Sequence, residues 1–409
     1  MFVYRFLMVL LLAGMTLIAG AAGIPISNPA KVEDMQQIVH IIGFDQSIQT
    51  AIRRDVENTN TAKPEAYLDV EVFMRPFTVD AINLHVSTVM AKYLSNDYAQ
   101  KLLKELPKPA GRNSTRIAQF EMNQNMDAAR REFKKLSPAD QKSVNEFRIS
   151  PTYLSLLNAL TNSLEERKEM LGNWSRDELQ GRIHSARKVI AELMERGLKA
   201  EKEENTDNLN LSDRIPLTGL RSFDQESRLT LNYLRANLKQ NLQFSEELKT
   251  LQLDKLLLPL SLTTRQGLEN SNLSILATET MFDNNSKRFD SLRAAYTTAL
   301  EKIVMPAQKR EELAVSNRNS MERILDFRLR RNEHLRTYIE LVKQILSLCE
   351  NRFGKIKFEA NSLIFDNDQD MNQYNAMIKQ IDVEIQALHE LDKEDWDYRN
   401  RSLETFKKK

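Results

Sequence analysis

The chain has very little of several residue types, and each shortage argues against a class of protein. Cys349 is the only cysteine among 409 residues, so no disulfide can form within the chain. The five histidines stand apart from one another, without the three- or four-residue spacing that places two zinc ligands on one helix face. No glycine-rich phosphate loop and no Gly-x-Ser-x-Gly motif occurs. We therefore predict no cofactor, no metal and no catalytic residues.

An excess of charge of one sign is also missing. The chain carries 58 basic and 57 acidic side chains, a net charge of +1, so no overall field would attract nucleic acid, and we predict no nucleic-acid partner. Glycine and proline are scarce, at 11 residues each, while 41% of the residues are apolar. This composition is typical of a folded helical protein and not of a disordered chain.

Long apolar runs are missing except at the N-terminus. Arg5 precedes an apolar run over residues 6–18, and small residues follow it at 19–23, a pattern typical of a secretory signal peptide. We predict a signal peptide over residues 1–22, cleaved near Ala21, and a periplasmic or secreted bacterial protein with no transmembrane segment in the mature chain. An uncleaved anchor is the alternative, but the run is shorter than the roughly 20 residues that span a bilayer.

One long helix is the main feature of what is present. From Pro306 to about Phe358 the pattern predicts a single helix, because good helix formers follow the proline and no glycine appears until Gly354. Apolar residues recur every three or four positions, which requires another long helix to cover them. Cys349 lies on this stripe, so we interpret it as a buried small apolar side chain and not as a nucleophile.

The helical patterns divide the chain into three parts. Residues 32–196 predict a compact helical domain, residues 197–212 a polar linker, and residues 213–409 a bundle. The predicted fold class is all-α, with the compact domain followed by an elongated antiparallel three- or four-helix bundle resembling a coiled coil. Within the first domain, Gly172-Asn173 predicts a helix break, Ser175 a new N-cap and Gly197 a helix end. Residues 67–74 alternate like a strand, but we interpret them as helix because no strand partner is evident.

A short pattern occurs twice, about 42 residues apart. Leu94-Ser95 is followed by Leu102 and Pro109, and Leu136-Ser137 by Val144 and Pro151, at the same offsets. Each serine is a good N-cap, and each proline ends that helix or opens the next. Two copies do not establish a solenoid, and chance placement explains them as well.

The first copy carries a family resemblance. The run from Tyr93-Leu94-Ser95-Asn96-Asp97-Tyr98 to Pro109-Ala110-Gly111 resembles the central pattern of the periplasmic domain of unknown function 2059 family, and the resemblance covers residues 32–120. It departs from the family at Lys108, where serine or threonine is favoured. The resemblance implies an exported helical domain without a known activity. Residues 213–409 resemble no family known to us.

The sharpest pattern for metal chemistry lies between the last two predicted helices. The carboxylates of Asp366, Asp368 and Asp370 alternate as Ca²⁺ ligands do. Met371 and Met377, however, stand where a calcium loop needs glycine and a bidentate glutamate. The favoured interpretation is a solvated loop that caps the final helix.

Basic residues crowd onto part of the long helix and form the candidate partner-binding site. They are Arg318, Arg323, Arg328, Arg330, Arg331 and Arg336. They suit an anionic lipid or an acidic protein surface, although pairing with acidic residues on neighbouring helices is the commoner explanation. A second cluster contains Lys101, Lys104, Lys108, Arg112 and Arg116, which Pro109 and Gly111 are expected to keep from forming one helical stripe.

The leading functional hypothesis is an exported, non-catalytic helical protein that acts as an interaction or structural module of the cell envelope. Its partner would be an envelope protein or a second copy of the chain, because helical seams commonly recognise other helices, and anionic lipid is a further possible partner. The alternative is a periplasmic or secreted enzyme or effector whose site is assembled from distant residues.

Overall fold

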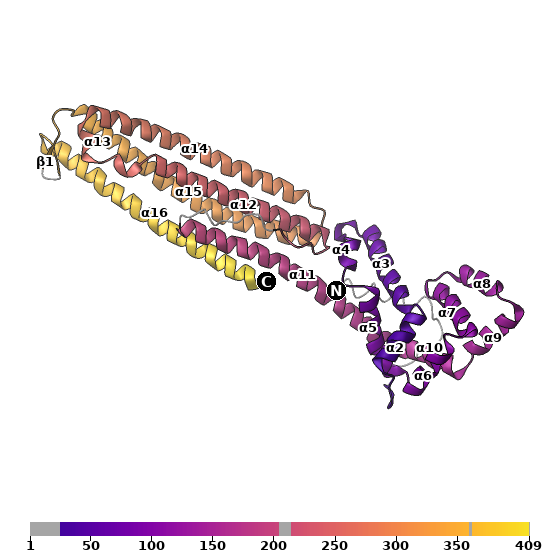
Figure 1. The fold of residues 1–409 in the computed structure, drawn as a ribbon. Helices are drawn as coiled ribbons and strands as arrows, with labels where there is room; N and C mark the ends of the chain where they lie inside the picture. Colours follow the sequence, from indigo (N-terminus) through magenta and orange to yellow (C-terminus); the bar gives the residue numbers. More distant parts are fainter. Residues whose placement is uncertain (1–24, 204–213, 360–361, 409) are drawn as a thin grey trace. The chain divides into compact units, whose positions relative to one another are not determined.

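A computed structural model describes residues 25–203, 214–359 and 362–408 (Figure 1). Almost all of these residues are helical, which confirms the all-α class. The predicted signal peptide, its cleavage site near Ala21 and residues 204–212 of the predicted linker lie outside the described residues. The chain forms two compact units, Met1–Ile183 with Leu217–Asp224, and His184–Pro216 with Gln225–Lys409.

The first unit consists of short helices followed by the start of a long one. They are α2 (Val32–Ile41), α3 (Phe44–Ala62), η1 (Pro64–Ala66), α4 (Val70–Met74), α5 (Val79–Met90), η2 (Ala91–Tyr93), α6 (Asn96–Glu105), α7 (Pro109–Met122), α8 (Met126–Lys134), α9 (Pro138–Arg148), α10 (Pro151–Asn162) and the beginning of α11 (Leu164–Glu203). Their main core contains fully buried Met35, Ile38 and Ile82, and α2 packs on α5 and α6. Of the segment 67–74, Val70–Met74 is helical as predicted, but the prediction is wrong for residues 67–69, because Leu68 forms an isolated antiparallel bridge with Leu220, a partner distant in the sequence.

The structure confirms the predicted N-caps at Ser95 and Ser137. Their hydroxyls each accept a hydrogen bond from the backbone N–H three residues on, at 3.3 and 3.1 Å, and the Ser150 hydroxyl does the same at 3.2 Å. Pro109 and Pro151 open α7 and α10, which decides between the two roles predicted for these prolines. A serine cap removes one unpaired backbone donor, and a proline at the first helical position removes another.

Helices α7, α8 and α9 form a small core of their own around Ile117, Ala129 and Val144. Arg148 links α9 to α7, because its guanidinium donates to both carboxylate oxygens of Glu121 on α7, at 3.0 and 3.1 Å. Gly111 lies inside α7, where a Cβ would come within 2.4 Å of the Glu105 carbonyl oxygen. The expectation that the second basic cluster does not form one helical stripe is confirmed, because Lys101 and Lys104 lie on α6 whereas Arg112 and Arg116 lie on α7, which Pro109 opens.

Helix α11 differs from the helix boundaries predicted from the sequence. It runs without interruption from Leu164 to Glu203, so the predicted break at Gly172-Asn173, the cap at Ser175 and the end at Gly197 are all wrong. Gly197 allows close packing of two helices, because a Cβ there would lie 3.0 Å from Leu238 Cδ2 on α12 (Arg221–Thr250). A glycine costs an exposed helix only about 1 kcal/mol, which packing on a neighbouring helix readily offsets.

The second unit is built from long helices and one small hairpin. Besides the end of α11 these are α12 (Arg221–Thr250), η3 (Leu253–Lys255), α13 (Pro259–Thr263), α14 (Arg265–Glu301), α15 (Ala307–Asn351), β1 (Lys357–Glu359), β2 (Ser362–Ile364) and α16 (Asp368–Lys408). The long helix ends earlier than predicted, at Asn351, because Gly354 adopts a φ of +81° and the chain then turns into the hairpin. Phe358 pairs with Leu363 across the two strands.

The long helices of this unit lie side by side (Figure 1), and their contacts fix their directions. Helices α15 and α16 are antiparallel, since Arg352, just after the end of α15, contacts Asp370 at the start of α16, and Phe327, near the middle of α15, contacts Tyr398 in the second half of α16. The predicted apolar stripe is buried at this seam, with Val342 and Ile345 fully covered and Ile381 4% exposed. Cys349 is fully buried there as well, as predicted.

Candidate functional site

Three of the six candidate arginines pair with the neighbouring helix. Arg323 and Arg330 both donate to the carboxylate of Glu394, at 2.9 and 3.1 Å, and Arg331 pairs with Asp392. All three contacts cross the α15–α16 seam, because an antiparallel pair of helices places these turns opposite one another. The alternative given for these residues, ion pairing with a neighbouring helix, therefore describes them.

Of the other three arginines, Arg328 packs against a neighbouring helix, whereas Arg318 and Arg336 are exposed. Arg328 places its guanidinium carbon 3.6 Å from the centre of the Phe289 ring on α14, and burial lowers its pKa to about 10. It belongs to the interior of the second unit and not to a binding surface. Arg318 and Arg336 are exposed and have no ion pair within the described part of the chain. The six arginines thus do not form one surface.

The three aspartates considered as Ca²⁺ ligands, Asp366, Asp368 and Asp370, do not form one site either. Asp370 is 5% exposed and accepts a hydrogen bond from Arg352 at 3.2 Å, while Asn367 caps its backbone N–H at 2.8 Å. The Arg352 hydrogen bond holds the pKa of Asp370 below its usual range. Asp366 and Asp368 are exposed. Over residues 25–203, 214–359 and 362–408, no three His, Cys, Asp or Glu side chains are placed to hold a metal ion.

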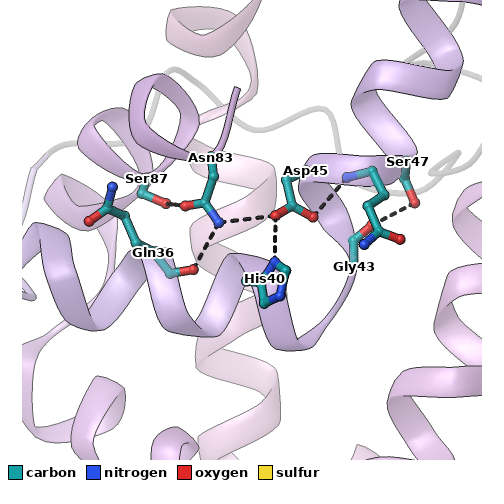
Figure 2. Close-up of polar contacts among 8 residues, drawn as sticks. Gln36, His40, Gly43, Asp45, Ser47, Asn83 and Ser87 are labelled. Atoms are coloured by element: carbon teal, nitrogen blue, oxygen red, sulfur yellow. Dashed lines mark hydrogen bonds and ion pairs between the residues drawn. The ribbon is translucent and has the colours of Figure 1, made fainter. Parts of the chain in front are cut away.

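A buried polar network lies in the first unit, where sequence reasoning had singled out nothing (Figure 2). The Asp45 side chain is fully buried near the start of α3. Its carboxylate accepts hydrogen bonds from Asn83 Nδ2 at 3.0 Å and from the Gln46 backbone N–H at 2.7 Å, and lies 3.1 Å from His40 Nδ1. Buried carboxylates need such partners because an unpaired charge in the interior is costly. The network therefore ties the α2–α3 turn to α5.

The same network holds Asn83 in place from both sides. Asn83 Nδ2 also donates to the Gln36 carbonyl at 3.1 Å, and its Oδ1 accepts from the Ser87 hydroxyl at 3.1 Å. Gly43 makes the geometry possible, since its φ of +67° gives the short turn that brings α3 back beside α2. A His and an Asp five residues apart around a glycine is the only signal in the sequence, and many unrelated loops share it.

The imidazole of His40 lies at the solvent-facing side of the network, with its side chain 64% exposed. A solvent-facing imidazole oriented by a buried carboxylate is how a general base is commonly held. The nearby hydroxyls are engaged elsewhere, because Ser47 donates to the Gly43 carbonyl and Ser87 to Asn83. Neither of these two hydroxyls therefore donates to the His40 imidazole.

Helix α13, the hairpin and the adjoining ends of α14, α15 and α16 meet at one end of the second unit (Figure 1). Several large apolar side chains of these elements are exposed. We call this the apolar end, defined by Leu258, Leu260, Phe353, Phe358 and Ile364. Leu260 is 73% exposed and Phe353 50%. Phe358 and Ile364 lie on opposite faces of the hairpin, because Phe358 pairs with Leu363 and Ile364 with Lys357, so the five side chains do not form one flat patch. Several exposed apolar side chains at one end nevertheless suit a contact surface.

Comparisons with known proteins add no assignment to these features. No protein-family model matches the chain, and neither a curated protein nor a solved structure is significantly similar to it. The resemblance to the domain of unknown function 2059 family therefore stays a prediction. Within the described part of the chain, no helix combines the length and the apolar character needed to cross a membrane.

Proposed function

We propose that the protein is an exported, non-catalytic helical protein that acts as an interaction or structural module of the cell envelope. The observation that carries this proposal is the apolar end, because five large apolar side chains exposed on neighbouring elements suit a protein contact. Export rests on the N-terminal sequence, and a protein partner in the envelope or a second copy of the chain would cover the apolar end.

The chemistry of the second unit agrees with a module of this kind. Its interior is filled by apolar side chains, and its arginines on α15 are largely used in contacts between helices. Exposed ion pairs of this type occupy the arginines in contacts between helices. Long helices packed side by side would present the apolar end to a partner.

A periplasmic or secreted enzyme or effector is the alternative. The His40–Asp45 pair favours it, since a buried carboxylate at 3.1 Å orients an exposed imidazole. An ester, phosphodiester or glycoside hydrolysis activity that the purified protein shows, and that His40→Ala abolishes while the fold is retained, would support this alternative over the module.

Residue-resolved cross-linking in the native cells, followed by mass spectrometry, tests the leading proposal. We expect cross-links to concentrate at the apolar end and to disappear in the double variant Leu260→Asp/Phe353→Asp. The matched control is Leu329→Asp, an equally open leucine, 59% exposed, in the middle of α15. Cross-links that persist in the double variant, or that the control loses equally, would refute the role of this surface.

The mass of the mature protein tests export separately. Cleavage near Ala21 would remove about two dozen residues, and recovery of the protein from the periplasm or the medium would accompany it. A full-length protein retained in the cytoplasm contradicts the envelope assignment without bearing on the contact surface.

A further inference from the structure

The basic residues of the second cluster concentrate positive charge on one part of the first unit. Between Lys101 and Arg148 the chain carries eleven basic and six acidic side chains, a net charge of +5, in a protein whose total is +1. The segment covers the end of α6 and all of α7, α8 and α9. Charge that averages out over the whole chain is therefore strongly uneven in the fold.

The acidic side chains of this segment already have partners. Glu105 pairs with Lys108 at 2.7 Å, Glu121 with Arg148 at 3.0 Å, and Glu132 with both Arg116 and Lys135. Asp127, Asp140 and Glu146 contact a neighbour one turn away. Among the described residues five exposed cations of the segment are left without an ion pair, namely Lys101, Lys104, Arg112, Arg131 and Lys134.

Helices α7 and α8 bring several of these cations together. Arg112 and Arg116 are one turn apart on the exposed side of α7, and Lys108 is the residue at its N-cap. Arg116 reaches across to Glu132 on α8, at 3.3 Å. Lys135 hydrogen-bonds the same carboxylate, and the nearby charges of Lys135, Arg116 and Arg131 favour its ionised form, which lowers the pKa of Glu132.

We define the α7–α8 basic surface as Lys108, Arg112, Arg116, Arg131 and Lys135. These five cations face two carboxylates, Glu105 and Glu132, so the surface keeps a positive excess. The side chains are well exposed, at 58% for Lys108, 52% for Arg116 and 68% for Lys135. Exposed pairs of this kind contribute little to stability, so the fold does not require the excess of positive charge.

From this arrangement we propose that the α7–α8 basic surface binds the phosphate headgroups of an anionic phospholipid bilayer. Long, exposed Lys and Arg side chains on the outer faces of two helices suit a plane of phosphates. Met126, at the turn between the two helices and 52% exposed, provides an apolar side chain for the interfacial region. The proposal deepens the envelope function by naming a lipid partner, and it rests on the predicted export for its biological setting.

Single-stranded nucleic acid is the less suitable partner. Its binding sites combine cations with aromatic side chains on which bases stack. Here Phe120 and Phe133 pack against the core of α7–α9, and Tyr98 lies 5.3 Å beneath the Lys101 ammonium. The basic surface therefore offers charge without a stacking platform.

Cosedimentation of the purified protein with vesicles tests the proposal. We compare vesicles of phosphatidylcholine alone with vesicles that contain phosphatidylglycerol, at low and high salt. We expect binding only to the anionic vesicles, and loss of that binding at high salt because screening weakens exposed charges. Binding to both kinds of vesicle alike, or to neither, would overturn the proposal.

A matched pair of variants distinguishes the effect of this particular surface on vesicle binding from the effect of the net charge of the protein. Arg112→Gln/Arg131→Gln removes two unpaired cations of the basic surface, and Arg318→Gln/Arg336→Gln removes two unpaired cations from α15. Both lower the net charge by two, and thermal melts verify that both fold. We expect the first variant to bind anionic vesicles at least tenfold more weakly and the second to bind like the wild type. Equal losses in the two variants, or tighter binding to single-stranded DNA or an acidic peptide than to vesicles, would refute a lipid-binding surface.

This experiment is independent of the test of the apolar end. Vesicle binding uses residues of the first unit, whereas Leu260 and Phe353 belong to the second. Failure of vesicle binding with intact cross-links at the apolar end would remove only the lipid proposal. Loss of the cross-links with intact vesicle binding would remove only the protein-contact proposal.

Discussion

Truncation of Ile345 is the sharpest test of the packing in the second unit. Ile345 is fully buried on α15, one turn before Cys349, and belongs to the same apolar core as Val342 and Ile381. Ile345→Ala removes three carbon atoms from a site with no access to solvent. Truncations of this kind cost about 2–5 kcal/mol, the larger values where the cavity cannot collapse. We expect a loss of about 3 kcal/mol in the free energy of unfolding.

The single cysteine provides the assay. Cys349 is fully buried, and burial raises the pKa of its thiol to about 11, so it should react with a thiol reagent only when the seam opens. A loss of about 3 kcal/mol corresponds to a roughly hundredfold larger open population, and the reaction rate should rise by that factor if opening and closing are fast. Denaturant titration gives the stability change independently.

Leu329→Ala is the control, since Leu329 lies on the same helix and is 59% exposed. It should leave the rate within a factor of about three, as expected for exposed positions. Rapid labelling of the native wild type, or equal rates in Ile345→Ala and wild type, would show that the α15–α16 seam is not the closed core described above.

Three further predictions concern charged groups. Burial raises the pKa of Asp55 to about 6, so the folded state holds this proton more tightly than the unfolded state does, and the stability of the protein falls as pH rises from about 4 to 6. Asp55→Asn should therefore stabilise the protein by about 1–2 kcal/mol at pH 7.5, after a discount for solvent screening, and should not stabilise it at pH 3.5. Urea titrations at the two pH values would measure this difference. The hydrogen bond from His334 lowers the pKa of Glu384, so the pair's stabilisation is present above the ordinary Glu pKa and disappears as pH falls through the lowered value. Glu384→Gln should therefore lower the melting temperature at pH 6, and this loss should shrink as the pH is lowered further. A loss that does not depend on pH would contradict this. Arg167 is 2% exposed, and in the described chain no carboxylate lies within hydrogen-bonding distance of it. Arg167→Met should therefore leave the stability unchanged or raise it in thermal melts. Arg167→Ala should lower the free energy of unfolding by about 2 kcal/mol, because packing on Phe44 is lost.

Local features of the fold could be read from the sequence with some accuracy. Ser95, Ser137 and Ser150 were recognisable as N-caps because a hydroxyl that accepts a backbone N–H acts within one turn of its own helix. The apolar spacing around Ile345 likewise required a covering helix, whichever helix supplied it. The all-α class follows from signals of this kind summed along the chain.

The tertiary structure decided what local signals could not. Helix α11 continues through Gly172 and Gly197 because packing outweighs a helix preference of about 1 kcal/mol per glycine. Arg323 and Arg331 became inter-helix ion pairs instead of a partner surface because α16 places Glu394 and Asp392 opposite them. The His40–Asp45 network and the α7–α8 basic surface join residues of different helices. Spacing along the chain specifies one helix at a time, and contacts between helices depend on how their axes pack.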